Sequence, residues 1–457
     1  MRVLILKFLL PLLSLAAFLE PYWGAVYYSF ISVIRPEQLT YGNTAISGVF
    51  AAAISCLFLS CLIYKENLLA VLRQGFFQCF LVFLAALYVS TYMSPFTDFL
   101  APKGSIYYLK QMPQVLVFCG CLYAILIRRG AAGFNLYLKL LVFFFLFMGL
   151  WGIDQHLRGN VLVERLFGSS ITDRCAVTGI YILYLPLAVY LTRSRDVWTR
   201  SLGLLSVTVY LVMIVLTQSR AGFLGLCLAT VLMFLRSNRK KRFILCGGLL
   251  LIAGAVWVPD GYLERMQQMK VQDVEDAELT DYSSASRQLL WQVALEMISD
   301  RPLLGVGNLN FSAASVEYSA RFKEQTNSAL YGYTFLKDGK SRLTHTHNTF
   351  LNLLVEGGML SSLPYFFMLF MPFGRGRILN ERYRGRPDDR LELFNLINCG
   401  LAGFLVTAFF SNMMLVDYFY WNLTLSCYLA DRLENDCGEP GMAACPASPA
   451  YSEAPTP

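Results

Sequence analysis

Two of the three histidines in this chain are separated by a single residue, in the segment His345-Thr346-His347-Asn348. A neutral imidazole can take a proton from a hydroxyl near neutral pH, and the positive end of a helix beginning here would help to keep the ring neutral. A metal site needs more ligands than His-x-His supplies. The segment is therefore a candidate general base, and a histidine held by neighbouring carbonyls is the alternative interpretation.

Two arginines stand at positions that an anionic ligand would explain. Arg220 follows a polar turn between two apolar blocks, where its guanidinium could bind a diphosphate through paired hydrogen bonds or reach lipid headgroups. Arg287 falls in the first turn of a helix predicted over 287–299, where a cation opposes the helix dipole and requires an anionic partner. Trp291 on the same helix is an interfacial anchor or a face on which a sugar can stack.

A polar stripe follows the histidines. Asn348, Asn352 and Glu356 recur at four-residue spacing, which places them on one side of an otherwise apolar helix. Nine residues at about 100° each put Glu356 nearly opposite His347 on an ideal helix, so we do not expect it to orient that imidazole. The stripe can instead bond neighbouring helices.

The composition indicates that lipid surrounds the elements that position these residues. Hydrophobic residues make up 56% of the 457 positions and charged residues 15%, whereas a soluble chain carries about 25% charged residues. In hydrocarbon every backbone polar group must be paired within its own segment, so the apolar blocks must be helical. We predict an all-α integral membrane protein with about twelve transmembrane helices. The blocks lie at 3–20, 22–34, 44–64, 75–93, 106–127, 134–153, 176–192, 202–217, 221–235, 243–258, 347–373, 392–411 and 413–431.

The block at 22–34 is short for a span, so a tilted, interfacial or re-entrant helix stays open. The chain has a net charge of +7. Its basic residues cluster in every second loop rather than on one face, so nucleic acid is not an expected partner. The positive-inside rule assigns those loops to the cytoplasm. We predict N-terminal transmembrane helices over 1–258, a large extracytoplasmic loop over 259–346, C-terminal transmembrane helices over 347–431 and a disordered cytoplasmic tail over 432–457.

Three motifs in this order resemble the C-terminal signature of the O-antigen ligase and polymerase superfamily, over roughly 200–375. They are Ser-Arg-Ala-Gly from Ser219, Arg-x-x-x-Trp from Arg287 leading to Pro-Leu-Leu-Gly-Val-Gly, and His-Asn-Thr-Phe-Leu-Asn-Leu-Leu-x-Glu-x-Gly from His347. The segment 32–42 is similar to the N-terminal region of a branch described as O-glycosylation ligases linked to exosortase systems. Ser361 and the two residues before it stand where many members have a further glycine.

The resemblance implies a type C glycosyltransferase fold with its active site on the periplasmic face of the bacterial inner membrane. It implies a glycan donor linked to undecaprenyl diphosphate, which Arg220 and Arg287 would hold while His347 activates the acceptor hydroxyl. It implies no metal and no cofactor, and lipid A core, another glycan or a protein as the acceptor. The further candidates for substrate binding are Arg35, Arg174, His345, Asn348 and Trp291, with Lys103 beside them.

Two alternatives remain. A polymerase of the same superfamily needs the same donor grip and the same base. From another class, a lipid-linked sugar flippase or transporter predicts repeat symmetry and ionisable groups near the middle of the bilayer. The sequence contains no internal repeat, and the candidate residues fall at one predicted interface, so the enzyme is the favoured interpretation.

Overall fold

The computed structural model describes residues 9–36, 48–96, 103–159, 173–236, 282–324, 326–337, 340–341 and 344–438. Within these residues the chain is helical, apart from an antiparallel pair of two-residue strands. This confirms the predicted all-α class. The predicted block at 243–258, the residues 259–281 of the predicted loop, the tail from 439 onward and the side chain of Lys103 lie outside the described part.

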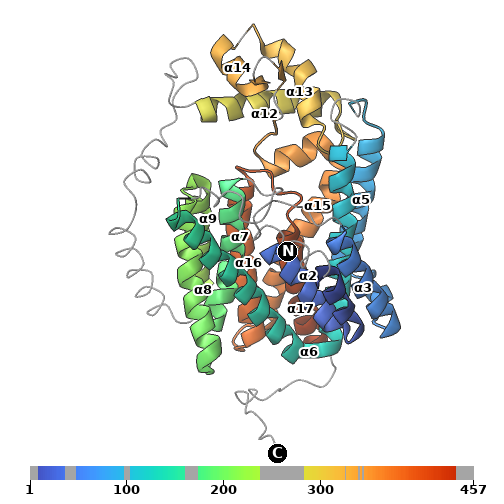
Figure 1. Ribbon diagram of the computed structural model, residues 1–457, viewed down its shortest axis with the longest axis vertical. Helices are drawn as coiled ribbons and strands as arrows, with labels where there is room; N and C mark the ends of the chain where they lie inside the picture. The colour runs from blue at the N-terminus through green and yellow to red at the C-terminus, as the bar shows by residue number, and fades with distance from the viewer. Residues whose placement is uncertain are drawn as a thin grey trace, which may run out of the picture.

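The helices and strands follow one another from η1 near the N-terminus to α17 (Figure 1). Their bounds are η1 (Ser14–Phe18), α2 (Pro21–Ile34), α3 (Val49–Ile63), α4 (Leu68–Val71), α5 (Gly75–Tyr92), α6 (Lys103–Leu157), α7 (Arg174–Leu191), α8 (Val197–Leu216), α9 (Arg220–Arg236), α12 (Tyr282–Asp300), α13 (Phe311–Ser319), η3 (Ala320–Phe322), α14 (Ser328–Phe335), β1 (Leu336–Lys337), β2 (Lys340–Ser341), α15 (Thr349–Arg382), α16 (Asp389–Ala408) and α17 (Asp417–Gly438).

Six helices of the described part are long and apolar enough to cross a membrane, namely α5, α6, α7, α8, α15 and α16. The predicted number of about twelve spans stays a prediction. Helix α2 covers the short block at 22–34, and its 14 residues span about 21 Å, less than the hydrocarbon core of about 30 Å. Most of its residues are buried against other helices.

Helix α6 is a pair of arms rather than one rod. Its 55 residues would extend about 80 Å if straight, far more than a bilayer is thick. Gly130, with φ +64° and ψ −155°, breaks the helix between the predicted blocks 106–127 and 134–153. The neighbouring Arg128 forms an ion pair with the buried Glu66, with 2.7 Å between Nε and Oε1, and this pair lies beside the break.

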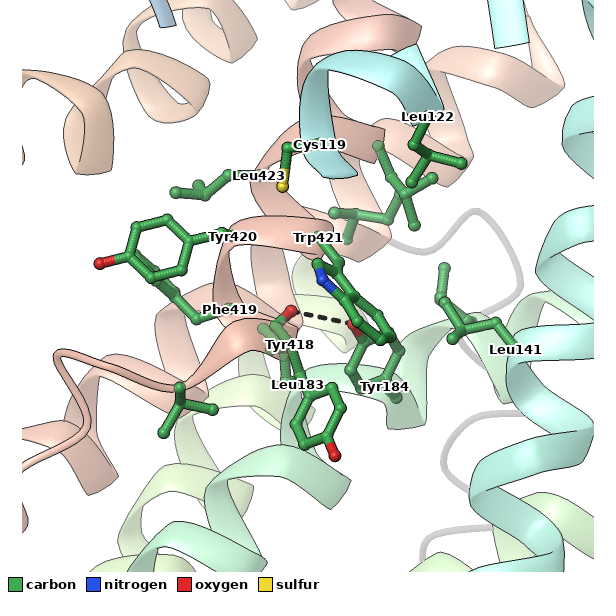
Figure 2. Close-up of a cluster of buried hydrophobic side chains, with 14 of the residues drawn as sticks. Cys119, Leu122, Leu141, Leu183, Tyr184, Tyr418, Phe419, Tyr420, Trp421 and Leu423 are labelled. Carbon is green, nitrogen blue, oxygen red and sulfur yellow. Dashed lines mark hydrogen bonds between the residues drawn. The ribbon is translucent and has the colours of Figure 1, made fainter. Parts of the chain in front are cut away.

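The helices pack through aromatic side chains around α7, α17 and the second arm of α6 (Figure 2). The Tyr184 hydroxyl donates to the Tyr418 carbonyl at 2.9 Å, and the rings of Tyr184 and Phe145 stack with centroids 4.3 Å apart. Because lipid tails are as apolar as these rings, close packing and satisfied polar groups hold such a core together, rather than exclusion of water.

Helices α7, α9 and α16 approach one another through small residues. A Cβ on Gly225 of α9 would lie 2.5 Å from the Gly403 carbonyl oxygen of α16, and one on Gly222 would lie 2.2 Å from Thr178 Cγ2 of α7. Small residues allow backbones in a membrane to come this close. The contact holds the beginning of α9, and with it Arg220, beside the beginning of α7.

Helices α12, α13 and α14 lie together at one end of the helical body (Figure 1). Helix α12 contains the predicted helix 287–299 but begins at Tyr282, so Arg287 lies in its second turn rather than its first. Burial explains the earlier start, since Ala285 is buried in the same small core as Leu289. The dipole argument for Arg287 therefore loses its basis, because the dipole effect is confined to the first turn.

The loop after α12 is inserted into a break in α15. Gly358, with φ +60° and ψ −172°, interrupts that helix. The Val306 and Gly307 N–H groups donate to the carbonyls of Val355 and Glu356 at 2.8 and 2.9 Å, and the Met359 N–H donates to the Pro302 carbonyl at 2.8 Å. The break therefore has its backbone groups paired, and the glycine-rich motif joins α12 to α15.

Candidate functional site

The segment between β2 and α15 carries both histidines. Asn348 is the N-cap of α15, and its Oδ1 accepts from the N–H groups of Phe350 and Leu351, both at 3.0 Å. His347 immediately before it has φ +51°, a conformation that non-glycine residues rarely adopt. Its backbone N–H donates to Nδ1 of His345 at 3.1 Å, and the two rings lie with centroids 4.0 Å apart. The histidines are thus held as a pair at the beginning of a helix.

Helix α12 contacts this segment through Trp291. The indole Nε1–H donates to the Thr346 carbonyl at 2.8 Å, and the ring meets Phe409 edge-on with centroids 5.8 Å apart. Arg287 lies one turn earlier on α12, half-buried, and four residues of helix bring it onto the same face as Trp291. The predicted stacking residue is therefore engaged with the protein through its N–H and through a T-shaped contact with Phe409.

The beginnings of α7 and α9 form another side of the site. Asp173 caps α7 by accepting from the Cys175 N–H at 3.0 Å, and Arg174 follows it as the first residue of the helix. The Ser219 hydroxyl donates to Cys175 Sγ at 3.3 Å. Arg220 follows Ser219 and begins α9, so Arg174 and Arg220 both stand at helix N-termini that lie side by side.

Asp173 also ties these helices to the histidine segment. Its carboxylate accepts a hydrogen bond from Ser411, whose carbonyl accepts from Thr349 at 2.6 Å, two residues after His347. Sequence reasoning missed both Asp173 and Ser411. The position of Asp173 directly before an apolar block is the signal of a helix N-cap, but Ser411 has no comparable signal.

The electrostatic surroundings of His345 include Arg287, which lies close to the histidine pair. Burial lowers the pKa of the His345 imidazole, the negative charge of Asp173 raises it, and the positive charge of Arg287 lowers it. The Arg287 charge also acts on Cys175, beside Ser219. Arg287, the histidine pair and the beginnings of α7 and α9 therefore converge at the end of the body that α12 covers.

Arg35 belongs to a second cluster. It ends α2 with φ +45°, and its guanidinium lies over the Phe50 ring at 5.5 Å from the centroid. Its charge acts on Asp417 at the beginning of α17, which also accepts from Gln111 Nε2 at 3.2 Å. Ser411 lies in the loop between α16 and α17, and Asp417 begins α17 six residues later, so this cluster adjoins the histidine site without being part of it.

An apolar groove of about 540 Å³ lies between α9, α15 and α16. Phe409 in its wall contacts Trp291 on one side and Phe350, in the first turn of α15, on the other, with ring centroids 5.8 and 6.5 Å apart. The groove thus begins next to the polar site and continues between α9, α15 and α16. Its wall consists of Leu228, Phe370, Phe373, Ala402, Leu405, Val406, Phe409 and Phe410.

Comparison with known families finds a match over part of the chain. Residues 204–366 match the family model described as O-Antigen ligase. Comparison with curated proteins finds no match. The matched segment runs from α8 into α15 and contains Arg220, Arg287, Trp291 and the histidine pair, whereas Asp173 precedes it. The match supports the resemblance of residues 204–366 to the O-antigen ligase and polymerase superfamily.

Proposed function

We propose that this protein transfers a glycan from undecaprenyl diphosphate to an acceptor hydroxyl on the periplasmic face of the bacterial inner membrane. The observation that carries the proposal is the convergence of Arg287, the beginning of α9 with Arg220, and the His345–His347 pair at one end of a membrane-type helical body. The family match supports glycosyl transfer in general. The donor and the acceptor are proposed from the resemblance together with the site chemistry, and the membrane face from the positive-inside rule.

The two arginines suit a diphosphate. A guanidinium presents a planar fork of donors that pairs with two phosphate oxygens, and it keeps its charge at any physiological pH. Arg220 stands at the N-terminus of a 17-residue helix, where backbone N–H groups add to the attraction for an anion. As the donor bond breaks, negative charge grows on the departing diphosphate, and fixed cations stabilise that charge without reorganisation.

His347 supplies the base in this proposal. Its imidazole takes the proton of the acceptor hydroxyl while the hydroxyl oxygen forms a bond to the anomeric carbon of the donor sugar. The bond between that carbon and the phosphate oxygen breaks, and its electron pair leaves with undecaprenyl diphosphate. Attack from the face opposite the leaving group inverts the anomeric carbon.

The apolar groove between α9, α15 and α16 suits the polyprenyl tail of such a donor. Its wall is made of aliphatic and aromatic side chains, and it begins at Phe409, which contacts Trp291 of the polar site. Because lipid solvates a polyprenyl chain as well as these side chains do, the groove would fix the path of the tail rather than add much affinity.

Replacing Arg287 or Arg220 with alanine is expected to weaken donor binding by about 10- to 100-fold, the loss that follows from removing a charge-assisted hydrogen bond. Binding of a labelled lipid-linked glycan to the purified protein in lipid nanodiscs measures this. Arg321→Ala is the matched control, because Arg321 is exposed near α12 and pairs with Glu296 and Asp300. Wild-type affinity in both site variants would contradict the diphosphate clamp.

The acceptor is tested in cells. In a strain that lacks this protein, loss of a ligase leaves finished polymer on its carrier lipid, and loss of a polymerase leaves single repeats there. We expect stranded polymer, because the proposal is a ligase. Accumulation of single repeats would assign the protein to polymerisation and leave the donor grip and the base unchanged.

A further inference from the structure

The backbone at His347 needs an external support. A non-glycine residue in the left-handed region is strained relative to its ordinary conformations, and such residues persist where neighbours hold them. At His347, with φ +51°, the N–H donates to Nδ1 of His345 at 3.1 Å. The two rings lie against each other with centroids 4.0 Å apart. His345 therefore contacts both the strained backbone and the ring of His347.

This hydrogen bond fixes the chemical form of His345. A ring nitrogen accepts a hydrogen bond only when it carries no proton, so Nδ1 is bare and the single proton of the neutral ring lies on Nε2. Burial favours this neutral form, and the charged groups that act on His345 are Asp173 before α7 and Arg287 on α12. His347 is the titratable group beside it. A proton on Nδ1 would replace the acceptor with a donor and break the support.

We propose that His345 is a positioning residue: its neutral imidazole holds His347 in the left-handed backbone conformation, and protonation of His345 releases it. This rests on the proposed role of His347 as the base. It assigns to His345 a role distinct from binding substrate, because its accepting nitrogen is engaged with the backbone. Catalysis then requires two neutral imidazoles, one that takes the proton and one that keeps the first in place.

Two replacements of similar size separate this role from a merely structural one. In His345→Asn the side-chain oxygen sits near the position of Nδ1 and accepts the same N–H without titrating, whereas His345→Gln places its amide near Nε2 and lacks that acceptor. We expect His345→Asn to keep kcat near the wild-type value, and His345→Gln to lose on the order of 10²-fold in kcat with little change in the donor KM.

The acid side of the pH profile gives an independent readout. Log kcat of the wild type is expected to fall with a slope approaching two as both imidazoles are protonated, and that of His345→Asn with a slope of one. Equal kcat in the Asn and Gln variants, or an unchanged slope in His345→Asn, would overturn the positioning role. Full activity in His347→Ala would instead contradict the proposed role of His347 as the base. The His345 variants and the His347 variant therefore test the two proposals separately.

Discussion

Replacing His347 with alanine is expected to lower kcat for glycan transfer by about 10²- to 10⁴-fold, the contribution of a well-placed general base. The donor KM should change little, because Arg220 and Arg287 lie on other helices and keep their places. Single-turnover transfer from a lipid-linked glycan by the purified protein separates this loss of chemistry from any change in donor binding.

His156 provides the control for this experiment. It is the one histidine of the chain outside the His345–His347 pair, and it is exposed near the end of α6. His156→Ala is expected to keep wild-type kcat. A His347→Ala protein that folds normally and turns over as fast as His156→Ala would remove His347 from the mechanism.

Replacing Gly358 with alanine is expected to lower the free energy of unfolding by about 3 kcal/mol or more. Its φ and ψ lie in a region that essentially only glycine occupies, and a Cβ there would lie 2.2 Å from the Leu303 carbonyl oxygen and 2.6 Å from the Leu304 nitrogen. Both are backbone atoms of the inserted loop, so the clash cannot be relieved by rotation of a side chain. The midpoint of thermal unfolding in nanodiscs, followed by tryptophan fluorescence, measures the effect.

Gly374 on the same helix is the matched control, because a Cβ there meets nothing within 4 Å. Gly374→Ala is expected to stabilise the protein slightly, since alanine favours a helix interior over glycine by about 1 kcal/mol. The proposed function adds a second readout. The inserted loop joins α12 to α15, so Gly358→Ala should reduce transfer even where it folds, by separating Arg287 from His347. Equal unfolding midpoints for the two variants would contradict the tight fit at the break.

Local patterns were enough to predict several of the described helices. Helical periodicity is visible in one segment alone, because each span must satisfy its own backbone in lipid. The predicted helix 287–299 lies within α12, and the blocks 106–127 and 134–153 correspond to the two arms of α6. Helix ends were less accurate. Helix α17 continues to Gly438, past the predicted end of the last span at 431, where Arg375 pairs with Glu434 at 2.8 Å across the two helices.

The glycine-rich motif from Pro302 to Gly307 has a structural role that its position in the sequence does not reveal. Pro302 to Gly307 follows the helix of Arg287 in the sequence, yet its backbone is bonded to α15 at Gly358. The need for glycine at 305 and 358 comes from this contact, since a Cβ on Gly305 would lie 2.3 Å from the Val355 carbonyl oxygen. No property of either segment alone reveals the other.

The sequence by itself determined the helical membrane class, the residue types of the site and the two arginines and the imidazole that define its proposed chemistry. The tertiary structure alone decided that Asp173 and Ser411 join α7 to the histidine segment, and that Arg35 lies in a neighbouring cluster with Asp417. The physical reason is the range of the forces involved. Periodicity and capping act between residues within one or two turns, whereas the hydrogen bond between Ser411 and Asp173 joins residues 238 positions apart and exists only once the helices have packed.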